Sequence, residues 1–320
     1  MGNEQQTALT SPKAGSLQRQ ELTADLYRQF IAYIDASPAT IRAYTGHLRQ
    51  FMRYLNENGI KQPTRETVIA YREELKTRCK AATVQNYIEA VKLFFSWTAQ
   101  AGLYPNIADH VKGVKISKEH KKDYLTSEQA AAVLSEIDRS TPQGLRDYAL
   151  IALTLTGGLR VIEAHRANIG DIGKAGNATA LYIQGKGRED KADYVKLPIE
   201  VETALRAYLK SRGHPEPQQP LFTSLSHNSN GQRLTTRSIS GIIKKRLVNA
   251  GYESDRLTAH SLRHSAVTIA LLEGNSLQET QQFARHKNIT TTQIYAHNLD
   301  RAANKCEISI ANSIFKKGAK

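Results

Sequence analysis

The sequence is poor in cysteine and has no long apolar run, and each absence excludes a class of protein. Cys79 and Cys306 are the two cysteines among 320 residues. They are too few for a disulfide framework or a cysteine-rich metal site, and they suit a reducing compartment. The longest aliphatic run, Ala149 to Leu153, falls far short of the ~20 residues that span a bilayer. The polar N-terminus lacks the apolar core of a secretory signal, so we expect a cytoplasmic protein with no membrane contact.

Positive charge is in excess. Lys and Arg number 44 against 30 Asp and Glu, which leaves a formal net charge of +14. The excess is spread along the chain and is not confined to one tail. A polyanion is therefore the expected class of partner, with nucleic acid as the first candidate. A merely basic protein without such a partner is the alternative that charge alone leaves open.

The N-terminal third predicts a flexible arm followed by a small helical domain. Residues 1–22 are polar and without apolar periodicity, which is typical of an arm. Apolar residues at helical spacing then predict helices near 26–34, 38–58, 64–75 and 82–102. Ser37-Pro38 is a typical signal for the start of the second helix. Residues 23–108 are thus predicted to form an all-helical domain.

The rest of the chain predicts a basic linker and a second domain. Residues 109–124 hold five lysines without clear periodicity, which predicts either a segment that follows a phosphate backbone or a solvated tether. Helices are predicted near 126–136, 145–156, 199–211, 235–250, 261–273, 276–285, 290–296 and 300–315. Two short strands are predicted at 180–184 and 194–197 around a Gly-Lys-Gly turn. The predicted fold class is mainly α with a small β-sheet in the C-terminal domain, at 125–320.

Four polar motifs in this domain carry side chains that suit phosphoryl transfer. They are Thr156-Gly-Gly-Leu-Arg160 followed by Glu163, Gly185-Lys186-Gly187, His260-Ser-Leu-Arg263-His264, and Arg285-His286 followed by Thr290-Thr-Thr-Gln-Ile-Tyr295-Ala-His297. Arginine, lysine and histidine donate to phosphate oxygens and offset charge that develops during the reaction. A tyrosine supplies an oxygen nucleophile. Periodicity alone does not show that the motifs converge.

In order and spacing, these motifs resemble those of the tyrosine recombinase family, which includes phage integrases and Xer-like enzymes. The family pattern is T-G-x-R-x-x-E, a lysine in a G-K-G turn, H-x-L-R-H, and G-H-x-x-x-x-T-T-x-x-Y-x-H. The resemblance covers residues 23–315 and implies a core-type DNA-binding domain followed by a catalytic domain with a C-terminal interaction helix. It implies the catalytic set Arg160, Lys186, His260, Arg263, His286 and Tyr295.

The resemblance also implies a role for each of these side chains. Tyr295 is the nucleophile that attacks the scissile phosphorus, while Arg160 and Arg263 bind the non-bridging oxygens with planar forks that match a phosphate. Lys186 protonates the departing 5′ oxygen. Lys191 competes for that role, although the glycines on either side of Lys186 favour the latter.

Two histidines and one acid complete this picture. Because an ordinary tyrosine has a pKa of about 10, a proton acceptor is needed. His260 is the candidate, either as this acceptor or as a hydrogen-bond donor to the phosphate. His286 donates to a phosphate oxygen, Glu163 supports the first arginine, and His264 is a buried support. The alternative for His260 and His264 is a metal pair at i, i+4, but the H-E-x-x-H pattern is incomplete. Arg160 and Glu163 also have the spacing of an ordinary helix ion pair.

Departures from the family pattern and other basic residues lead to predictions about DNA contacts. Arg285 stands where relatives have glycine, and its charge beside the motif predicts an added phosphate contact. A solvated helix face is the alternative for the candidates of the first domain, and a solvated tether is the alternative for those in the linker. The remaining predicted DNA contacts are Arg42, Arg49, Arg53, Lys80, Lys112, Lys115, Lys121, Lys122, Arg237, Lys244 and Lys245.

The resemblance implies a site-specific recombinase that works through a 3′-phosphotyrosyl intermediate, for integration, excision or resolution of a mobile element. It implies no metal and no cofactor. The expected partners are double-stranded recombination sites, three further copies that form a tetramer on DNA through the C-terminal helix, and an accessory DNA-bending or directionality factor. Packing of that helix within its own domain is the alternative. Four protomers would exchange strands through a Holliday junction, and the protein would be associated with the nucleoid.

Two other functions stay open at this stage. A type IB topoisomerase has a similar active site and relaxes supercoiled DNA, although the small N-terminal helical domain and the T-T-x-x-Y pattern argue against it. A catalytically idle DNA-binding protein would retain the same residues for structure alone. The intact set of six side chains argues against this second alternative.

Overall fold

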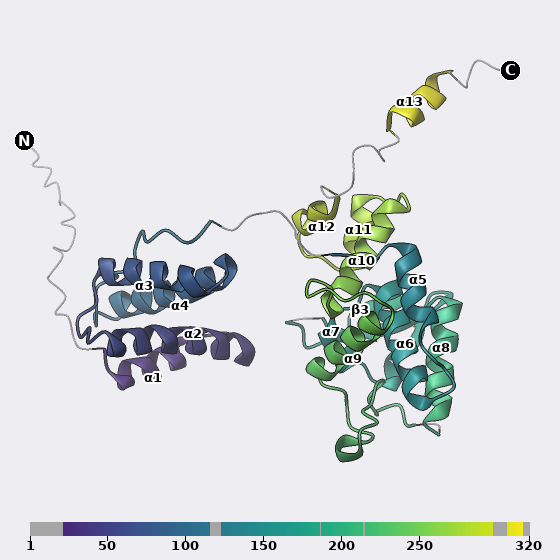
Figure 1. Ribbon diagram of the computed structural model, residues 1–320, viewed down its shortest axis with the longest axis horizontal. Coiled ribbons are helices and arrows are strands. Elements are labelled where there is room, and N and C mark those ends of the chain that lie inside the picture. The colour runs from purple at the N-terminus through teal and green to yellow at the C-terminus, as the bar shows by residue number, and fades with distance from the viewer. Residues whose placement is uncertain (1–21, 116–122, 186, 214, 297–305, 316–320) are drawn as a thin grey trace, which may run out of the picture. The chain divides into compact units, whose positions relative to one another are not determined.

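The chain divides into two compact units, Met1–Lys118 and Glu119–Lys320. The computed structural model describes residues 22–115, 123–185, 187–213, 215–296 and 306–315. Figure 1 shows the first unit in purple to blue and the second in teal to yellow. Within the described ranges, no helix combines the length and the apolar composition that a membrane span requires.

Four helices form the first unit, and local signals in the sequence define where they begin. The Thr23 hydroxyl accepts a hydrogen bond from the Leu26 N–H, and the Ser37 hydroxyl accepts one from Thr40, with Pro38 in the first turn of its helix. The helices are α1 (Ala24–Tyr33), α2 (Pro38–Glu57), α3 (Arg65–Arg78) and α4 (Ala81–Gln100). This arrangement confirms the all-helical prediction for the N-terminal domain.

Aromatic side chains fill the core of the first unit. Phe30 and Phe94 are fully buried and meet edge-on, with ring centroids 5.2 Å apart. Such pairs stabilise a core beyond the area they bury. Val111 is buried in the same core and Val114 packs against it. The N-terminal part of the predicted linker 109–124 therefore packs on the first unit.

The second unit is built around α6 (Pro142–Gly157), which is buried along most of its length. Its helices match the predicted segments, except that α7 was not anticipated because six residues show too little periodicity. The surrounding helices are α5 (Ser127–Ser135), α7 (Val161–Arg166), α8 (Ile199–Ser211), α9 (Thr236–Asn249), α10 (Ala259–Leu272), α11 (Leu277–Ala284) and α12 (Ile289–Ala296). Short 3-10 turns η1 (Ile169–Asp171) and η2 (His227–Ser229) lie between them.

A small antiparallel sheet accompanies these helices. Its strands run in the order β1 (Ile172–Ala175), β2 (Ala178–Ile183) and β3 (Asp193–Lys196), with Leu181 opposite both Ile172 and Val195. The sequence predicted β2 and β3 but not β1, whose four residues include a glycine and one large apolar side chain. The small sheet confirms the predicted fold class.

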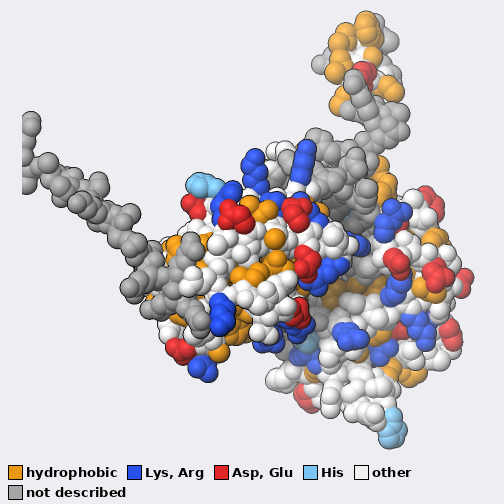
Figure 2. Space-filling model, turned by 60° about the vertical axis from the view of Figure 1, so that its left-hand side comes forward, with side chains coloured by type: hydrophobic (Ala, Val, Ile, Leu, Met, Phe, Trp, Pro, Cys, Tyr) orange, Lys and Arg blue, Asp and Glu red, His pale blue; other side chains and the backbone are white. Residues whose placement is uncertain are grey.

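The final described segment is α13 (Cys306–Phe315), and every one of its residues is exposed. Ile310 and Ile314 are 57% and 62% exposed, and Ile308 and Phe315 are more so. Figure 2 shows the hydrophobic side chains on the surface of this helix. The predicted helix at 300–315 is thus observed from 306 onward, and residues 300–305 lie outside the described residues.

Candidate active site

The first predicted motif lies where α6 ends and α7 begins. Gly158 ends α6 in the left-handed conformation, at φ 55°, which glycine adopts without strain. Arg160 then precedes α7, and its backbone N–H donates to the Glu163 carboxylate at 2.8 Å. The Arg160 guanidinium donates to the other oxygen of the same carboxylate at 2.9 Å. Glu163 is 1% exposed, so this buried acid fixes both the backbone and the side chain of Arg160.

The second predicted arginine comes from α10. Arg263 is 1% exposed, and its guanidinium donates to the carbonyl oxygens of Gly158 and Ala284. These carbonyls belong to the ends of α6 and α11, so Arg263 joins the first and last motifs. The structure therefore brings Arg160 and Arg263 to the same turn.

Tyr295 lies on α12 between two histidine rings. Its ring centroid is 4.4 Å from that of His264 on α10 and 6.0 Å from that of His286. The tyrosine is 5% exposed and packs in a small apolar cluster with Val267 and Ala284. His260 lies at the exposed start of α10. The third and fourth motifs thus meet at the proposed nucleophile.

The electrostatics of this cluster favour an anion. Burial and the neighbouring charges of Arg160 and Arg285 lower the pKa of Arg263 to about 9, which leaves it charged at pH 7. Burial alone would raise the pKa of the Glu163 carboxyl, but the charge of Arg285 and the hydrogen bonds from Arg160 hold it below its ordinary value. Three guanidinium groups face one carboxylate, so the site keeps an excess of positive charge that a phosphate would offset.

Burial also shifts the pKa values of Tyr295 and of the neighbouring His286. It raises the pKa of the Tyr295 hydroxyl, although Arg263 and Arg160 act in the opposite direction. Burial, followed by the charges of Arg263, Arg160, Arg285 and His260, lowers the pKa of His286 to about 4. Tyr295 therefore stays protonated and His286 stays neutral at pH 7 when no DNA is bound.

We expect the His286 imidazole to titrate near pH 4 in the free protein, as measured by NMR of its ring signals. Its folded-state pKa lies below the ordinary value of 6.5, so the unfolded chain binds the proton more readily. The contribution of His286 to the free energy of unfolding is complete above pH 6.5 and is lost as the pH falls toward 4. His286→Gln should lose less stability over that window than wild type. An equal loss in both proteins contradicts this prediction.

The catalytic lysine predicted on the β2–β3 turn, Lys186, lies outside the described residues. Its competitor Lys191 is engaged elsewhere, because its ammonium contacts both oxygens of Asp171 at 2.6 and 2.7 Å. Arg166 on α7 donates to the Gly185 carbonyl at 3.0 Å and thereby ties the start of the turn to the helix that follows Arg160. These contacts favour Lys186 over Lys191.

Most of the predicted DNA contacts are exposed. Arg42, Arg49 and Arg53 lie at i, i+7 and i+11 on α2, so they share one helix face. Figure 2 shows Lys and Arg side chains distributed over the visible surface among acidic ones. Lys121 and Lys122 lie outside the described residues. The other exposed candidates are Lys80, Lys112, Lys115, Arg237 and Lys245.

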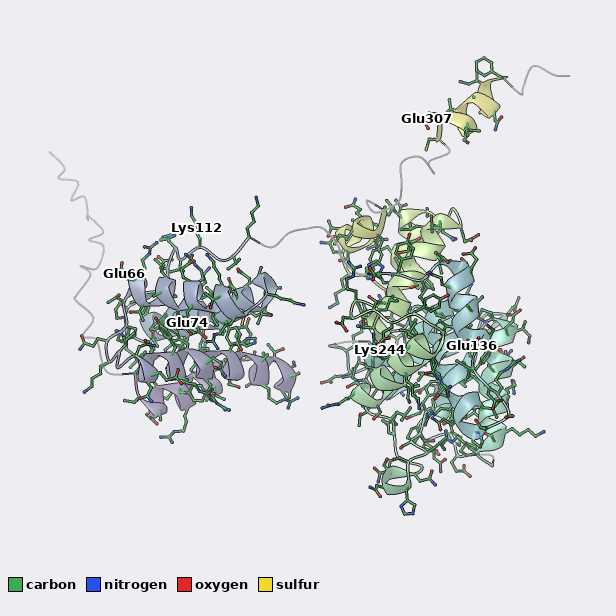
Figure 3. The ribbon with its side chains drawn as sticks, in the orientation of Figure 1. Glu66, Glu74, Lys112, Glu136, Lys244 and Glu307 are labelled. Carbon is green, nitrogen blue, oxygen red and sulfur yellow. The ribbon has the colours of Figure 1, made fainter. Side chains whose placement is uncertain are left out.

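Two of the residues predicted to contact DNA have side chains that interact with other groups of the protein. Lys244 extends from α9 (Figure 3), and its ammonium donates to the carbonyl oxygen of Ser254 at 2.6 Å. The Arg285 side chain is 8% exposed and forms an ion pair with Glu163 at 3.1 Å. The phosphate contact that the sequence suggested for Arg285 does not fit this burial, because its charge already faces a carboxylate.

Sequence reasoning assigned no role to Thr292, which the structure places against His286. The Thr292 hydroxyl is fully buried and lies 2.9 Å from Nδ1 of the imidazole. When this hydroxyl donates to Nδ1, the proton of the neutral ring resides on Nε2, which becomes the donor toward a substrate. Thr292 belongs to the Thr-Thr pair of the fourth motif, so the sequence pattern marked its position. Its role could not be predicted from that pattern, because the contact with His286 depends on how the chain packs.

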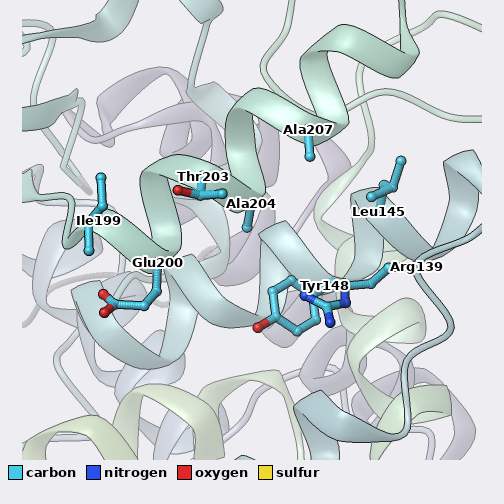
Figure 4. A pocket seen from close by; sticks show the side chains of 8 residues that line it. All are labelled: Arg139, Leu145, Tyr148, Ile199, Glu200, Thr203, Ala204 and Ala207. Carbon is cyan, nitrogen blue, oxygen red and sulfur yellow. The ribbon is translucent and has the colours of Figure 1, made fainter.

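One cavity of about 570 Å³ borders this cluster, because Gly157 and Arg285 are among its lining residues, whereas another lies apart from it. A depression of about 620 Å³ between α6 and α8 (Figure 4) holds none of the predicted catalytic side chains. Its lining residues are Arg139, Leu145, Tyr148, Ile199, Glu200, Thr203, Ala204 and Ala207. A second, more apolar groove of about 590 Å³ lies among α5, α6, α10 and α11. Arg160, Arg263, His286 and Tyr295 are not among the lining residues of these three cavities.

Comparison with known proteins gives the same division of the chain. Residues 123–302 match the model of the phage integrase family. Residues 24–102 match the model of the phage integrase N-terminal SAM-like domain. The two matched ranges fall within the two units described above.

Relatives of similar length match most of the chain. It is 30% identical over 273 residues to a tyrosine recombinase of Synechococcus elongatus, covering 81% of this chain and 84% of that protein. It is 29% identical over 286 residues to tyrosine recombinase XerD of Listeria monocytogenes, covering 85% of this chain and 94% of XerD.

Two solved structures show the same fold. One is the XerH site-specific recombinase bound to palindromic difH substrate in a post-cleavage complex, with a TM-score of 0.69 and 22% identity; the match covers 91% of this chain and 84% of that chain. The other is the Tn1549 transposon integrase in complex with transposon right end DNA, with a TM-score of 0.68 and 19% identity. That match covers 89% of this chain and 98% of the integrase chain.

Proposed function

The chain belongs to the phage integrase family and is a site-specific tyrosine recombinase, and from that premise we propose that Tyr295 is its nucleophile. The observation that carries this proposal is the position of Tyr295 between two histidine rings, within the electrostatic influence of Arg160 and Arg263. The substrate is a phosphodiester in double-stranded DNA. The protein acts on it in the cytoplasm, where it associates with the nucleoid.

Strand cleavage is a transfer of the phosphoryl group to tyrosine. The Tyr295 oxygen forms a bond to phosphorus while the bond from phosphorus to the 5′ oxygen breaks. The products are a 3′-phosphotyrosine and a free 5′ hydroxyl. Because the phosphodiester bond is exchanged and not hydrolysed, a 5′ hydroxyl of another strand can reverse the step without ATP.

Arg160 and Arg263 bind the non-bridging oxygens in this proposal. Charge accumulates on these oxygens as the pentacovalent state forms, and guanidinium forks held in place lower its energy. The neutral imidazole of His286 donates to the same phosphate. The excess positive charge of this cluster supports these roles.

Proton transfer involves the two ends of the reaction. Tyr295 must lose a proton during attack, and His260, exposed at the start of α10, is the proposed acceptor. The departing 5′ oxygen must gain a proton, and Lys186 is the proposed donor. The pairing of Lys191 with Asp171 supports this choice of lysine.

The arginine face of α2 is the proposed contact of the first unit with DNA. Gly46 lies on this face between Arg42 and Arg49, and a Cβ atom there would meet nothing within 4 Å. A glycine in an exposed helix interior is unfavourable by about 0.5–1 kcal/mol relative to alanine. The low surface that it leaves between two arginines permits close approach of a phosphate backbone. Lys112 and Lys115, which follow α4 in the chain, are further exposed basic residues of the first unit that we propose as DNA contacts.

Strand exchange requires several protomers, and α13 is the proposed connection between them. Its exposed Ile310, Ile314 and Phe315 match in character the apolar groove among α5, α6, α10 and α11. Leu134, Leu155 and Phe283 are among the groove's lining residues. We propose that α13 of one copy occupies this groove on the next copy, which leads to a tetramer on DNA. An accessory DNA-bending or directionality factor stays a prediction.

We expect the double substitution Ile310→Glu with Ile314→Glu to abolish the assemblies in which protomers bound at different DNA sites contact one another. Two charges cannot be buried in an apolar groove without a large desolvation cost. Native gels of protein on DNA with two binding sites measure the assemblies, and binding to a single site should stay within about twofold of wild type. Ser309→Glu with Asn312→Glu, on the polar side of α13, is the matched control. Intact assemblies in the first variant would contradict the proposed docking.

The function itself is tested with nicked DNA fragments that span the ends of the element carrying the gene. Wild-type protein should form a detergent-resistant adduct that a denaturing gel resolves. Tight binding without an adduct would favour the idle DNA-binding alternative. Relaxation of supercoiled plasmid at any sequence would favour the topoisomerase alternative.

A further inference from the structure

Arg285 adopts a backbone conformation that favours glycine. It ends α11 at φ 54°, in the left-handed region. A side chain in this region brings Cβ too close to the following carbonyl oxygen, so a non-glycine residue here is strained. Among the described residues, His110 is the other non-glycine residue with positive φ. The strain at Arg285 must be offset by contacts of its side chain.

The Arg285 guanidinium makes contacts that fit this requirement. One terminal nitrogen donates to the carbonyl oxygens of Phe283 at 2.7 Å and of Gly157 at 3.2 Å. The other donates to the Gly158 carbonyl at 2.9 Å and to the Glu163 carboxylate at 3.1 Å. These acceptors belong to the ends of α6 and α11 and to α7. A single side chain therefore spans both turns that carry catalytic candidates.

Arg285 and Arg160 are linked through Glu163 and through the backbone. The Glu163 oxygen that accepts from the Arg285 side chain also accepts from the Arg160 backbone N–H at 2.8 Å. In return, the Arg285 carbonyl accepts a hydrogen bond from the Arg160 guanidinium at 3.4 Å. The residue after Arg285 is His286. A shift of Arg285 thus changes the position of two proposed phosphate donors at once.

We propose that Arg285 is a positioning residue that holds Arg160 and His286 in the geometry required for strand cleavage, and that it does not bind phosphate. This inference rests on the proposed function of the arginine and histidine. The two terminal nitrogens of Arg285 donate to protein acceptors, one of which is the Glu163 carboxylate that offsets its charge, and its side chain is 8% exposed. Arg160 shares this carboxylate but has a side chain that is 29% exposed, and Arg263 donates to backbone carbonyls that carry no net charge. Lysine in its place would retain the charge but would lack the planar fork that reaches several acceptors.

The test compares Arg285→Gly and Arg285→Lys with wild type in single-turnover cleavage of nicked DNA. The glycine variant should cleave about 10- to 100-fold more slowly, because misplacing catalytic groups by about 1 Å costs up to ~10²-fold. The lysine variant should show a smaller loss of rate, together with a lower melting temperature because it gives up some of these hydrogen bonds. His110→Gly, which relieves the same backbone conformation at an exposed site, is the matched control and should cleave at the wild-type rate.

DNA affinity separates positioning from phosphate binding. The slope of log affinity against log salt should be the same for Arg285→Gly and wild type. Removal of a phosphate contact instead changes the slope by about 0.9, as we expect for Arg49→Ala on α2. A reduced slope in Arg285→Gly would overturn the proposal, as would cleavage at the wild-type rate in either Arg285 variant.

Two further measurements distinguish a failure of this proposal from a failure of the proposed function. In Arg285→Gly with Glu163→Gln, the effect on cleavage should be smaller than the product of the single effects, because both act on Arg160. In the free protein, the side-chain Nε–Hε NMR signal of Arg160 should broaden or shift in Arg285→Gly. An unchanged Arg160 signal would overturn the positioning role even if wild-type protein formed no adduct with the DNA tested.

Discussion

Tyr295→Phe should form no covalent adduct with nicked DNA, while its affinity for the same DNA stays within about twofold of wild type. Phenylalanine retains the ring that packs between His264 and His286 in the cluster with Val267 and Ala284. It lacks the oxygen that would bond to phosphorus, and no other group of the site replaces that oxygen in this mechanism. A denaturing gel detects the adduct, and a gel-shift titration measures the affinity.

Tyr71→Phe is the matched control for this experiment. Tyr71 is fully buried in the core of the first unit, and its hydroxyl has no hydrogen-bond partner among the residues that the structure describes. Removing that hydroxyl leaves no acceptor unsatisfied, so adduct formation should equal that of wild type. An adduct in Tyr295→Phe at the wild-type position would contradict the assignment of the nucleophile. Loss of the adduct in both variants would indicate damage unrelated to the chemistry.

Arg263→Lys should lower the single-turnover cleavage rate by about 10²- to 10³-fold, which is about 3–4 kcal/mol of transition-state stabilisation. Arg263 is buried and joins the carbonyl oxygens of Gly158 and Ala284, so its fork is oriented before the substrate arrives. Lysine retains a positive charge but presents a compact ammonium on a flexible stem. It cannot hold both carbonyls and a phosphate with the same geometry.

A second buried arginine serves as the control for loss of packing. Arg146 is 5% exposed and donates to Asp147, which also pairs with Arg246 and so joins α6 to α9. Arg146→Lys should lower the melting temperature but leave the cleavage rate of the folded protein near that of wild type. Cleavage by Arg263→Lys within tenfold of wild type would contradict its proposed role. A rate loss in both variants would indicate a general effect of buried arginines.

The sequence by itself determined the helices, the order of the domains and the candidate catalytic set. Helix starts such as Thr23 and Ser37-Pro38 depend on hydrogen bonds to residues three positions away, which a local pattern records. The four motifs are likewise local, and their order along the chain could be compared with a family without knowledge of the fold. Periodicity failed for α7 and β1, because six and four residues carry too little pattern.

Tertiary structure alone decided which charged groups are available to a substrate. Arg285 and Gly157 are 128 positions apart in the sequence, and nothing local indicates that the guanidinium of one reaches the carbonyl of the other. The pairing of Lys191 with Asp171 across 20 positions is a similar case. Whether a charge can reach DNA depends on its exposure and on its internal partners, and both depend on which helix and strand ends pack together. The sequence supplied the chemical groups, whereas packing determined which of them contact one another and which, in the proposed mechanism, can face a phosphate.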